Sequence, residues 1–123
     1  MNRRPRALKW VGSSYDDFRA FPSGVQDDMG YALYHAQIGN TPRTVKPLKG
    51  FKGAGVVEIV ESHDGNAFRA IYTVKFDSAV YVLHAFQKKS KSGIKTPQVE
   101  IDLVERRLKA AAMDHLESKG TRH

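Results

Sequence analysis

Basic residues gather in two short stretches of this chain that contain no acidic residue and could bind a polyanion. Residues 41–57 and 88–95 hold eight of these cations: Arg43, Lys46, Lys49, Lys52, Lys88, Lys89, Lys91 and Lys95. Lysines act as movable point charges for phosphate, whereas an arginine such as Arg69, set in a strand-like segment, can grip a phosphate through two parallel hydrogen bonds. The pattern indicates a phosphate site, although solvated surface lysines would give the same composition.

These residue types could also catalyse the cleavage of RNA. Cleavage of RNA by its own 2′-hydroxyl needs a base for that hydroxyl, cations for the phosphate and an acid for the leaving 5′-oxygen. A metal-free ribonuclease is therefore chemically coherent, and lysines that only bind RNA, or bind nothing, are the alternative. Tyr72 and His84 are secondary candidates for proton transfer. His84 shares the parity of Val80 and Val82, which favours a hydrogen-bonded core or rim histidine over a catalytic one.

Other enzyme classes find little support. The chain has no glycine-rich phosphate loop, no nucleophile elbow and no histidine pair at metal-ligand spacing, so we expect neither a metal nor a cofactor. It has no cysteine, which fits a reducing cytoplasm. No apolar run approaches the roughly 20 residues of a membrane-spanning helix, and no secretory signal follows the basic N-terminus.

The length and the charge of the chain indicate the number of domains and the class of partner. The 123 residues predict one domain over 1–123, with ends at 1–6 and 119–123 expected to be flexible. Lys and Arg number 20 against 13 Asp and Glu, a net charge of +7 with a pI near 9.8. That excess favours nucleic acid or an acidic protein as the partner.

The first half of the chain predicts a short strand over 7–12 and two helices, one ending near Phe21 and one running from Ser23 to Gly39. Tyr31 and Tyr34 lie off the apolar stripe of the second helix, where they would either cover a neighbouring element or face a partner. Four residues form that stripe: Val25, Met29, Leu33 and Ala36.

The second half predicts a loop over 40–55 and three antiparallel strands over 56–61, 67–76 and 79–88, with a hairpin at Asp64-Gly65. In the middle strand, alternation places Arg69 on the face opposite Phe68 and Tyr72. Thr96 as N-cap and Pro97 at the first helical position begin a last helix that ends near Ser118. These elements indicate an α+β fold in which two N-terminal helices and a C-terminal helix cover one face of a small, curved antiparallel sheet.

Three segments carry a resemblance to a known family: "KPLKGFKGAGVVEIVE", "FRAIYTVKF" and "VYVLHAFQKKSKSGIKTPQVEIDLVERRL". Over roughly residues 7–112 the chain resembles the HigB-like, phage-derived branch of the RelE/ParE toxin superfamily. The resemblance implies a RelE-type α+β fold, a cytoplasmic type II toxin that cleaves mRNA on the ribosome, and a helix-turn-helix, HigA-like antitoxin as its partner.

The same resemblance implies roles for individual residues. Arg69 matches the phosphate-gripping arginine, and Lys88 or Lys89 matches the basic position that stabilises the transition state. Glu58 departs from the pattern because a catalytic lysine of RelE stands there, and the late catalytic tyrosine of RelE has no match. Lys49 and Lys52 match the basic loop through which the family contacts RNA. The charge pattern adds Arg43, Lys46, Lys91 and Lys95 as RNA-binding candidates.

Two rival functions remain open at this point. A ParE-like toxin would act on DNA gyrase without cleaving RNA, and the departure at Glu58 favours that alternative. A toxin-fold remnant would only bind antitoxin or nucleic acid. The nuclease predicts cut transcripts, the gyrase toxin predicts DNA damage with intact mRNA, and the remnant predicts harmless expression.

Overall fold

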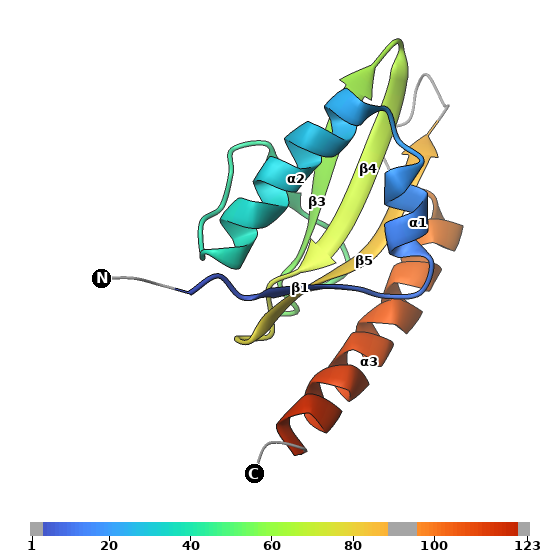
Figure 1. Ribbon diagram of the computed structural model, residues 1–123. Helices are drawn as coiled ribbons and strands as arrows, with labels where there is room; N and C mark the ends of the chain where they lie inside the picture. The colour runs from blue at the N-terminus through green and yellow to red at the C-terminus, as the bar shows by residue number, and fades with distance from the viewer. Residues whose placement is uncertain (1–3, 89–95, 121–123) are drawn as a thin grey trace.

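A five-stranded sheet organises the computed structural model, which describes residues 4–88 and 96–120 (Figure 1). The strand order is β1-β5-β4-β3-β2, in which β1 runs parallel to β5 and every other neighbouring pair is antiparallel. The strands are β1 (Ala7–Trp10), β2 (Val45–Pro47), β3 (Val56–His63), β4 (Asn66–Thr73) and β5 (Ala79–Lys88). The helices are α1 (Ser14–Arg19), α2 (Ser23–Gln37) and α3 (Gln98–Gly120).

Helices cover both faces of this sheet, so the prediction that they share one face is wrong. On one side, which we call the α2 face, α1 and α2 pack on the sheet, and the predicted stripe of α2 is buried (Figure 1). On the other side, the α3 face, Val104 and Ala111 of α3 pack against Ile71, Tyr81 and Leu83. Two apolar cores result because side chains alternate across each strand.

Most predicted elements are confirmed, with shifts at their ends. The segment expected to be a loop over 40–55 contains β2, which adds an edge strand beside β3. The hairpin between β3 and β4 turns at Asp64 and Gly65, both at positive φ (50° and 77°), as its sequence predicts. Arg6, expected in a flexible end, donates hydrogen bonds to the carbonyls of three residues: Ala36, Val74 and Phe76.

A bulge in β5 changes which face its last residues occupy. Tyr72 pairs with Val82, and the next pair along the ladder is Ile71 with His84, so Leu83 is an extra residue on β5. Such an insertion breaks the alternation of side chains. His84 therefore lies on the α3 face with Phe86, not on the α2 face with Val82 as simple parity predicted.

Polar contacts fix α3 along its length. Arg107 donates to the Leu83 carbonyl and to the Ser13 hydroxyl, and it passes so close to Gly12 that a Cβ there would lie 2.8 Å from its Nε. Towards the C-terminus, the Tyr81 hydroxyl donates to Asp114. Among the described residues, no helix is both long and apolar enough to span a lipid bilayer.

Candidate functional site

A buried ion pair lies on the α3 face at the centre of the sheet. Arg69 Nη1 donates to Glu58 Oε2 at 2.7 Å, and the two residues are only 5% and 8% exposed. Thr96, just before α3, donates its hydroxyl to the same carboxylate oxygen at 3.0 Å. Alternation along β4 places Arg69 opposite the aromatic side, as predicted, and the sheet register places Glu58 on the neighbouring strand.

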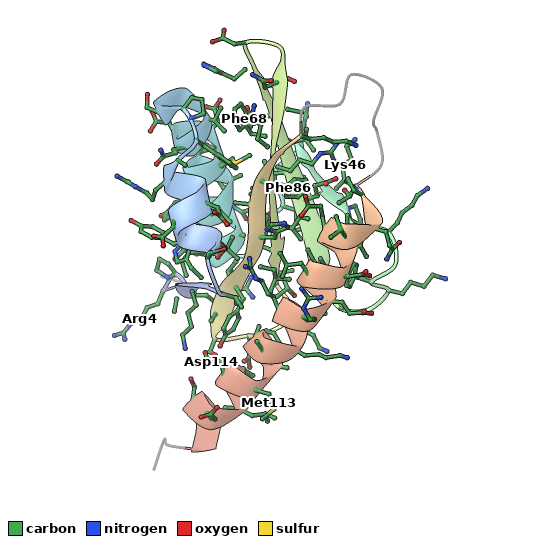
Figure 2. All side chains as sticks on the ribbon, turned by 90° about the vertical axis from the view of Figure 1, so that its right-hand side faces the viewer. Arg4, Lys46, Phe68, Phe86, Met113 and Asp114 are labelled. Atoms are coloured by element: carbon green, nitrogen blue, oxygen red, sulfur yellow. The ribbon has the colours of Figure 1, made fainter. Side chains whose placement is uncertain are left out.

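The strand register brings further cations to this pair. Lys46 on β2 is the cross-strand partner of Glu58, and Phe86 on β5 is the partner of Arg69. Lys88, two residues beyond Phe86, points to the same face because side chains repeat every second residue. In Figure 2, Lys46 and Phe86 lie on the side of the sheet where α3 begins, whereas Phe68 lies beside α2.

His84 occupies the same face, one strand away. Its Nε2 lies 2.7 Å from Glu100 Oε1 of α3, and its ring stacks on Phe86 with centroids 4.7 Å apart. Its Nδ1 is buried and has no hydrogen-bond partner in the part of the chain that the structure describes. We refer to Lys46, Glu58, Arg69, His84 and Lys88 together as the charged cluster.

Tyr72, the other proposed proton-transfer residue, is not part of the charged cluster. It lies in the core of the α2 face and is 1% exposed. Burial raises its pKa to about 12, so its hydroxyl stays protonated at neutral pH. The proposed role of Tyr72 does not fit this position, since β4 itself separates the side chain from Arg69.

The predicted RNA-binding residues separate into three groups. Lys46 joins the charged cluster, but Arg43 lines a pocket beside α2 with Asp28. Lys49 and Lys52 are exposed on the loop after β2, which is held to the C-terminal end of β4 by the bond from the Thr73 hydroxyl to the Ala54 carbonyl. Four residues of strand separate that point from Arg69, roughly 13 Å. Three predicted residues lie outside the described residues: Lys89, Lys91 and Lys95.

Residues 16–109 match the family of phage derived Gp49-like proteins, which is most of the chain. The chain belongs to this family. A double mutant of the E. coli toxin RelE in its free state shares the fold, with a TM-score of 0.58, 18% identity, and coverage of 84% of this chain and 98% of that chain. The RelBE2 toxin–antitoxin complex of Mycobacterium tuberculosis gives a TM-score of 0.45 at 16% identity, with coverage of 72% of this chain and 98% of that chain. No curated protein matches the chain.

The predicted α+β fold of RelE type is thus confirmed. Sequence reasoning noted Glu58 only as a departure and missed Glu100 entirely. Glu58 had a usable signal, because its parity with Val56 on β3 places it on the face of Arg69. Glu100 had none, since its contact with His84 depends on the bulge in β5.

The charged cluster offers cations, a carboxylate and an imidazole on one sheet face. Burying ions costs several kcal/mol each unless partners compensate, so an ion pair at a sheet centre is weak evidence for stability and marks a candidate site. Within residues 4–88 and 96–120, no three His, Cys, Asp or Glu residues come together as metal ligands would.

Proposed function

We propose that this Gp49-like chain is the toxin of a type II toxin–antitoxin pair and acts in the cytoplasm as a ribosome-dependent mRNA endoribonuclease. The observation that carries the proposal is the placement of Arg69 on a rigid central strand beside Glu58, with Lys46 and Lys88 on the same face. A planar guanidinium held this way binds a carboxylate or a phosphate with the same geometry. The resemblance to RelE/ParE toxins and the shared fold support the same reading.

Glu58 would have two roles in such a reaction. In the free protein its carboxylate occupies Arg69 at 2.7 Å, where the scissile phosphate would have to bind. Once the phosphate displaces it, the carboxylate lies beside the reacting group and can take the proton of the 2′-hydroxyl. The 2′-oxygen then attacks phosphorus, and the bond to the 5′-oxygen breaks. The products are a 2′,3′-cyclic phosphate and a 5′-hydroxyl end.

Cations would stabilise the charge that develops on the phosphate. Lys88 is the described candidate, and Lys89 remains proposed for the same role. The leaving 5′-oxygen needs a proton, for which the Lys88 ammonium and His84 are the candidates of the charged cluster. Lys46 would hold the RNA backbone near Glu58.

The proposed partners follow from the same family resemblance. A helix-turn-helix antitoxin would neutralise the toxin, and an acidic segment of it would be attracted by the net charge of +7. The mRNA would be bound on the ribosome, which supplies a second polyanionic surface.

Induced expression of Lys88→Gln tests the proposal, because this variant removes the charge and leaves the Arg69–Glu58 pair in place. We expect growth arrest to be lost and new 5′ ends on cellular mRNA, mapped by primer extension, to fall by roughly 100-fold. Lys109→Gln, an exposed lysine of α3 remote from the cluster, should arrest growth as the wild type does. Circular dichroism of both variants confirms that they are folded.

Three outcomes would contradict the proposal, the first in the role of Lys88 and the other two in the nuclease activity itself. Undiminished cleavage by Lys88→Gln would remove Lys88 from the mechanism. Filamentation and DNA damage with intact mRNA would favour a gyrase-directed toxin. Harmless expression of the wild-type chain without antitoxin would favour a protein that only binds.

A further inference from the structure

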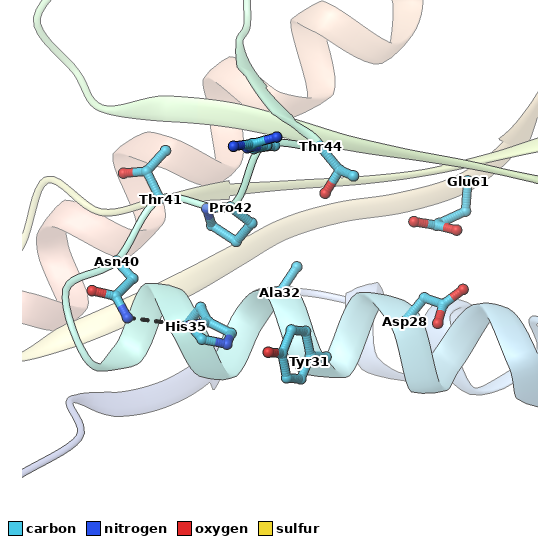
Figure 3. Close-up of a pocket in the computed structure, with 10 residues that line it drawn as sticks. Asp28, Tyr31, Ala32, His35, Asn40, Thr41, Pro42, Thr44 and Glu61 are labelled. Atoms are coloured by element: carbon cyan, nitrogen blue, oxygen red, sulfur yellow. Dashed lines mark hydrogen bonds between the residues drawn. The ribbon is translucent and has the colours of Figure 1, made fainter.

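A hollow of about 470 Å³ lies between α2 and the loop that leads into β2, beside the α2 face (Figure 3). We call it the α2 pocket. Its wall combines apolar side chains such as Ala32 and Pro42 with a few polar ones, as ligand-binding pockets do. The polar and aromatic residues that matter here are Asp28, Tyr31, His35, Arg43 and Glu61.

Two carboxyl groups meet at one end of the α2 pocket. Figure 3 shows Asp28 of α2 and Glu61 of β3 side by side, away from Asn40 and Thr41. Partial burial, followed by the charge of Asp28, raises the pKa of Glu61. Two carboxylates this close repel each other once both are ionised, and a cation placed between them would remove that repulsion.

Two exposed tyrosines follow Asp28 along α2. Tyr31 lines the pocket and is 67% exposed, and Tyr34, one turn further along α2, is 49% exposed. These exposures do not fit side chains that cover a neighbouring element. The Tyr31 ring contacts His35 edge-on, with centroids 4.4 Å apart. A tyrosine face attracts ammonium and guanidinium groups, and tyrosine is enriched at the anchor points of protein interfaces.

We propose that the α2 pocket docks a segment of a partner protein that inserts one arginine or lysine side chain between Asp28, Glu61 and Tyr31. The charges of the residues that line the α2 pocket favour a peptide over other ligands. Nucleic acid would meet the two carboxylates and be repelled, and a free polyamine would meet Arg43, which also lines the pocket. A peptide can satisfy both signs, with its cation at the carboxylates and an acidic residue or carbonyl near Arg43.

This inference does not depend on the proposed nuclease, because the α2 pocket and the charged cluster are on opposite faces of the sheet. A partner bound at α2 would lie across the sheet from Arg69 and Lys88. Loss of one function therefore need not affect the other, and each can be tested alone.

The test uses the full chain and a capped pentapeptide that contains one arginine and one glutamate. Its matched control carries citrulline, the neutral isostere of arginine, in the same position. In ¹⁵N-resolved NMR titrations we expect shifts confined to residues around Asp28, Tyr31 and Glu61, with a dissociation constant in roughly the millimolar range. The citrulline peptide should bind about tenfold more weakly. Equal binding of the two peptides, or binding of neither, would overturn the proposal.

Variants locate the binding site. Asp28→Asn keeps the shape of the side chain and should weaken the arginine peptide about tenfold. Asp27→Asn changes the adjacent exposed acid, which does not line the α2 pocket, and should stay within about twofold of the wild type. A titration with spermidine completes the test. If spermidine shifts the NMR signal of Asp28 and the arginine peptide does not, the α2 pocket is a polyamine site and protein docking is refuted.

Discussion

The two faces of β4 carry different chemistry although they share one strand and one degree of burial. Towards α2, the strand buries Phe68, Ala70 and Tyr72 in an apolar core. Towards α3, the same strand buries Arg69 next to Glu58, with Lys88 and His84 on the neighbouring strand. Apolar burial drives folding at roughly 25 cal/mol per Å². Ion burial opposes folding unless the partners compensate.

On β4, this difference separates a buried surface that apolar packing explains from one that it does not. On the α2 face, each buried side chain contributes to the packing that holds the sheet and α2 together. On the α3 face, Arg69 and Glu58 occupy positions that two apolar residues would fill at lower cost. Stability therefore does not by itself explain the ion pair, whereas binding of phosphate by Arg69 would account for it.

A double-mutant cycle on the ion pair should give the largest effect. Glu58→Leu removes the carboxylate that faces Arg69 at 2.7 Å, and we expect the free energy of unfolding to fall by ~3–5 kcal/mol, because a guanidinium loses its buried counter-ion. Arg69→Met should cost a similar amount. Urea denaturation, followed by circular dichroism, measures both.

The double variant Glu58→Leu/Arg69→Met is the informative member of the cycle. We expect its stability to return to within about 1 kcal/mol of the wild type, or above it, while RNA cleavage is abolished. Stability losses that simply add in the double variant would show that the pair contributes as two independent residues, and the contrast between the faces would fail.

A core substitution on the α2 face should separate stability from activity in the opposite way. Leu33→Ala opens a cavity under α2, where the wild-type side chain is fully buried, and should lower the free energy of unfolding by ~2–5 kcal/mol. Cleavage per folded molecule, assayed at a temperature where the variant stays folded, should not change. Leu33→Met fills most of the volume and should cost less than ~1.5 kcal/mol. A loss of specific activity in the folded Leu33→Ala variant would couple the two faces.

Local patterns in the sequence predicted most of the fold, and the reason is physical. The stripe of α2, the turn at Asp64-Gly65 and the alternation of β4 each depend on neighbouring residues alone. The position of α3 does not depend on neighbouring residues alone. Its apolar residues need a sheet face, but they do not specify which one, so the expected single-sided fold was wrong.

Less of the candidate site could be predicted, because much of it depends on contacts between residues that are far apart in the sequence. Alternation was enough to place Arg69, and the end of β5 was enough to place Lys88. The bulge at Leu83 was invisible in the sequence, and it moved His84 to the α3 face, where it meets Glu100. Arg43 was grouped with Lys46 because they are close in sequence, yet it lines the pocket beside α2, and Lys46 lies opposite Glu58.

The smallest expected effect concerns the acid pair of the α2 pocket. The pKa of Glu61 is raised in the folded state by partial burial and by Asp28, so folding favours its protonated form. The stability that this proton provides is present at low pH and is lost as pH rises through the folded pKa. Glu61→Gln should therefore be more stable than the wild type at pH 7–8, by only a few tenths of a kcal/mol because solvent screens the pair.

The difference between Glu61→Gln and the wild type should vanish near pH 3, where Glu61 is protonated in both the folded and unfolded states. Thermal unfolding at several pH values measures it. Glu105→Gln, an exposed glutamate of α3, should show no such pH-dependent gain. A stability gain at pH 3 equal to that at pH 8 would mean that the glutamine packs better, not that it relieves repulsion. The pH dependence thus decides whether partial burial and the charge of Asp28 together disfavour the ionised form of Glu61 in the folded protein.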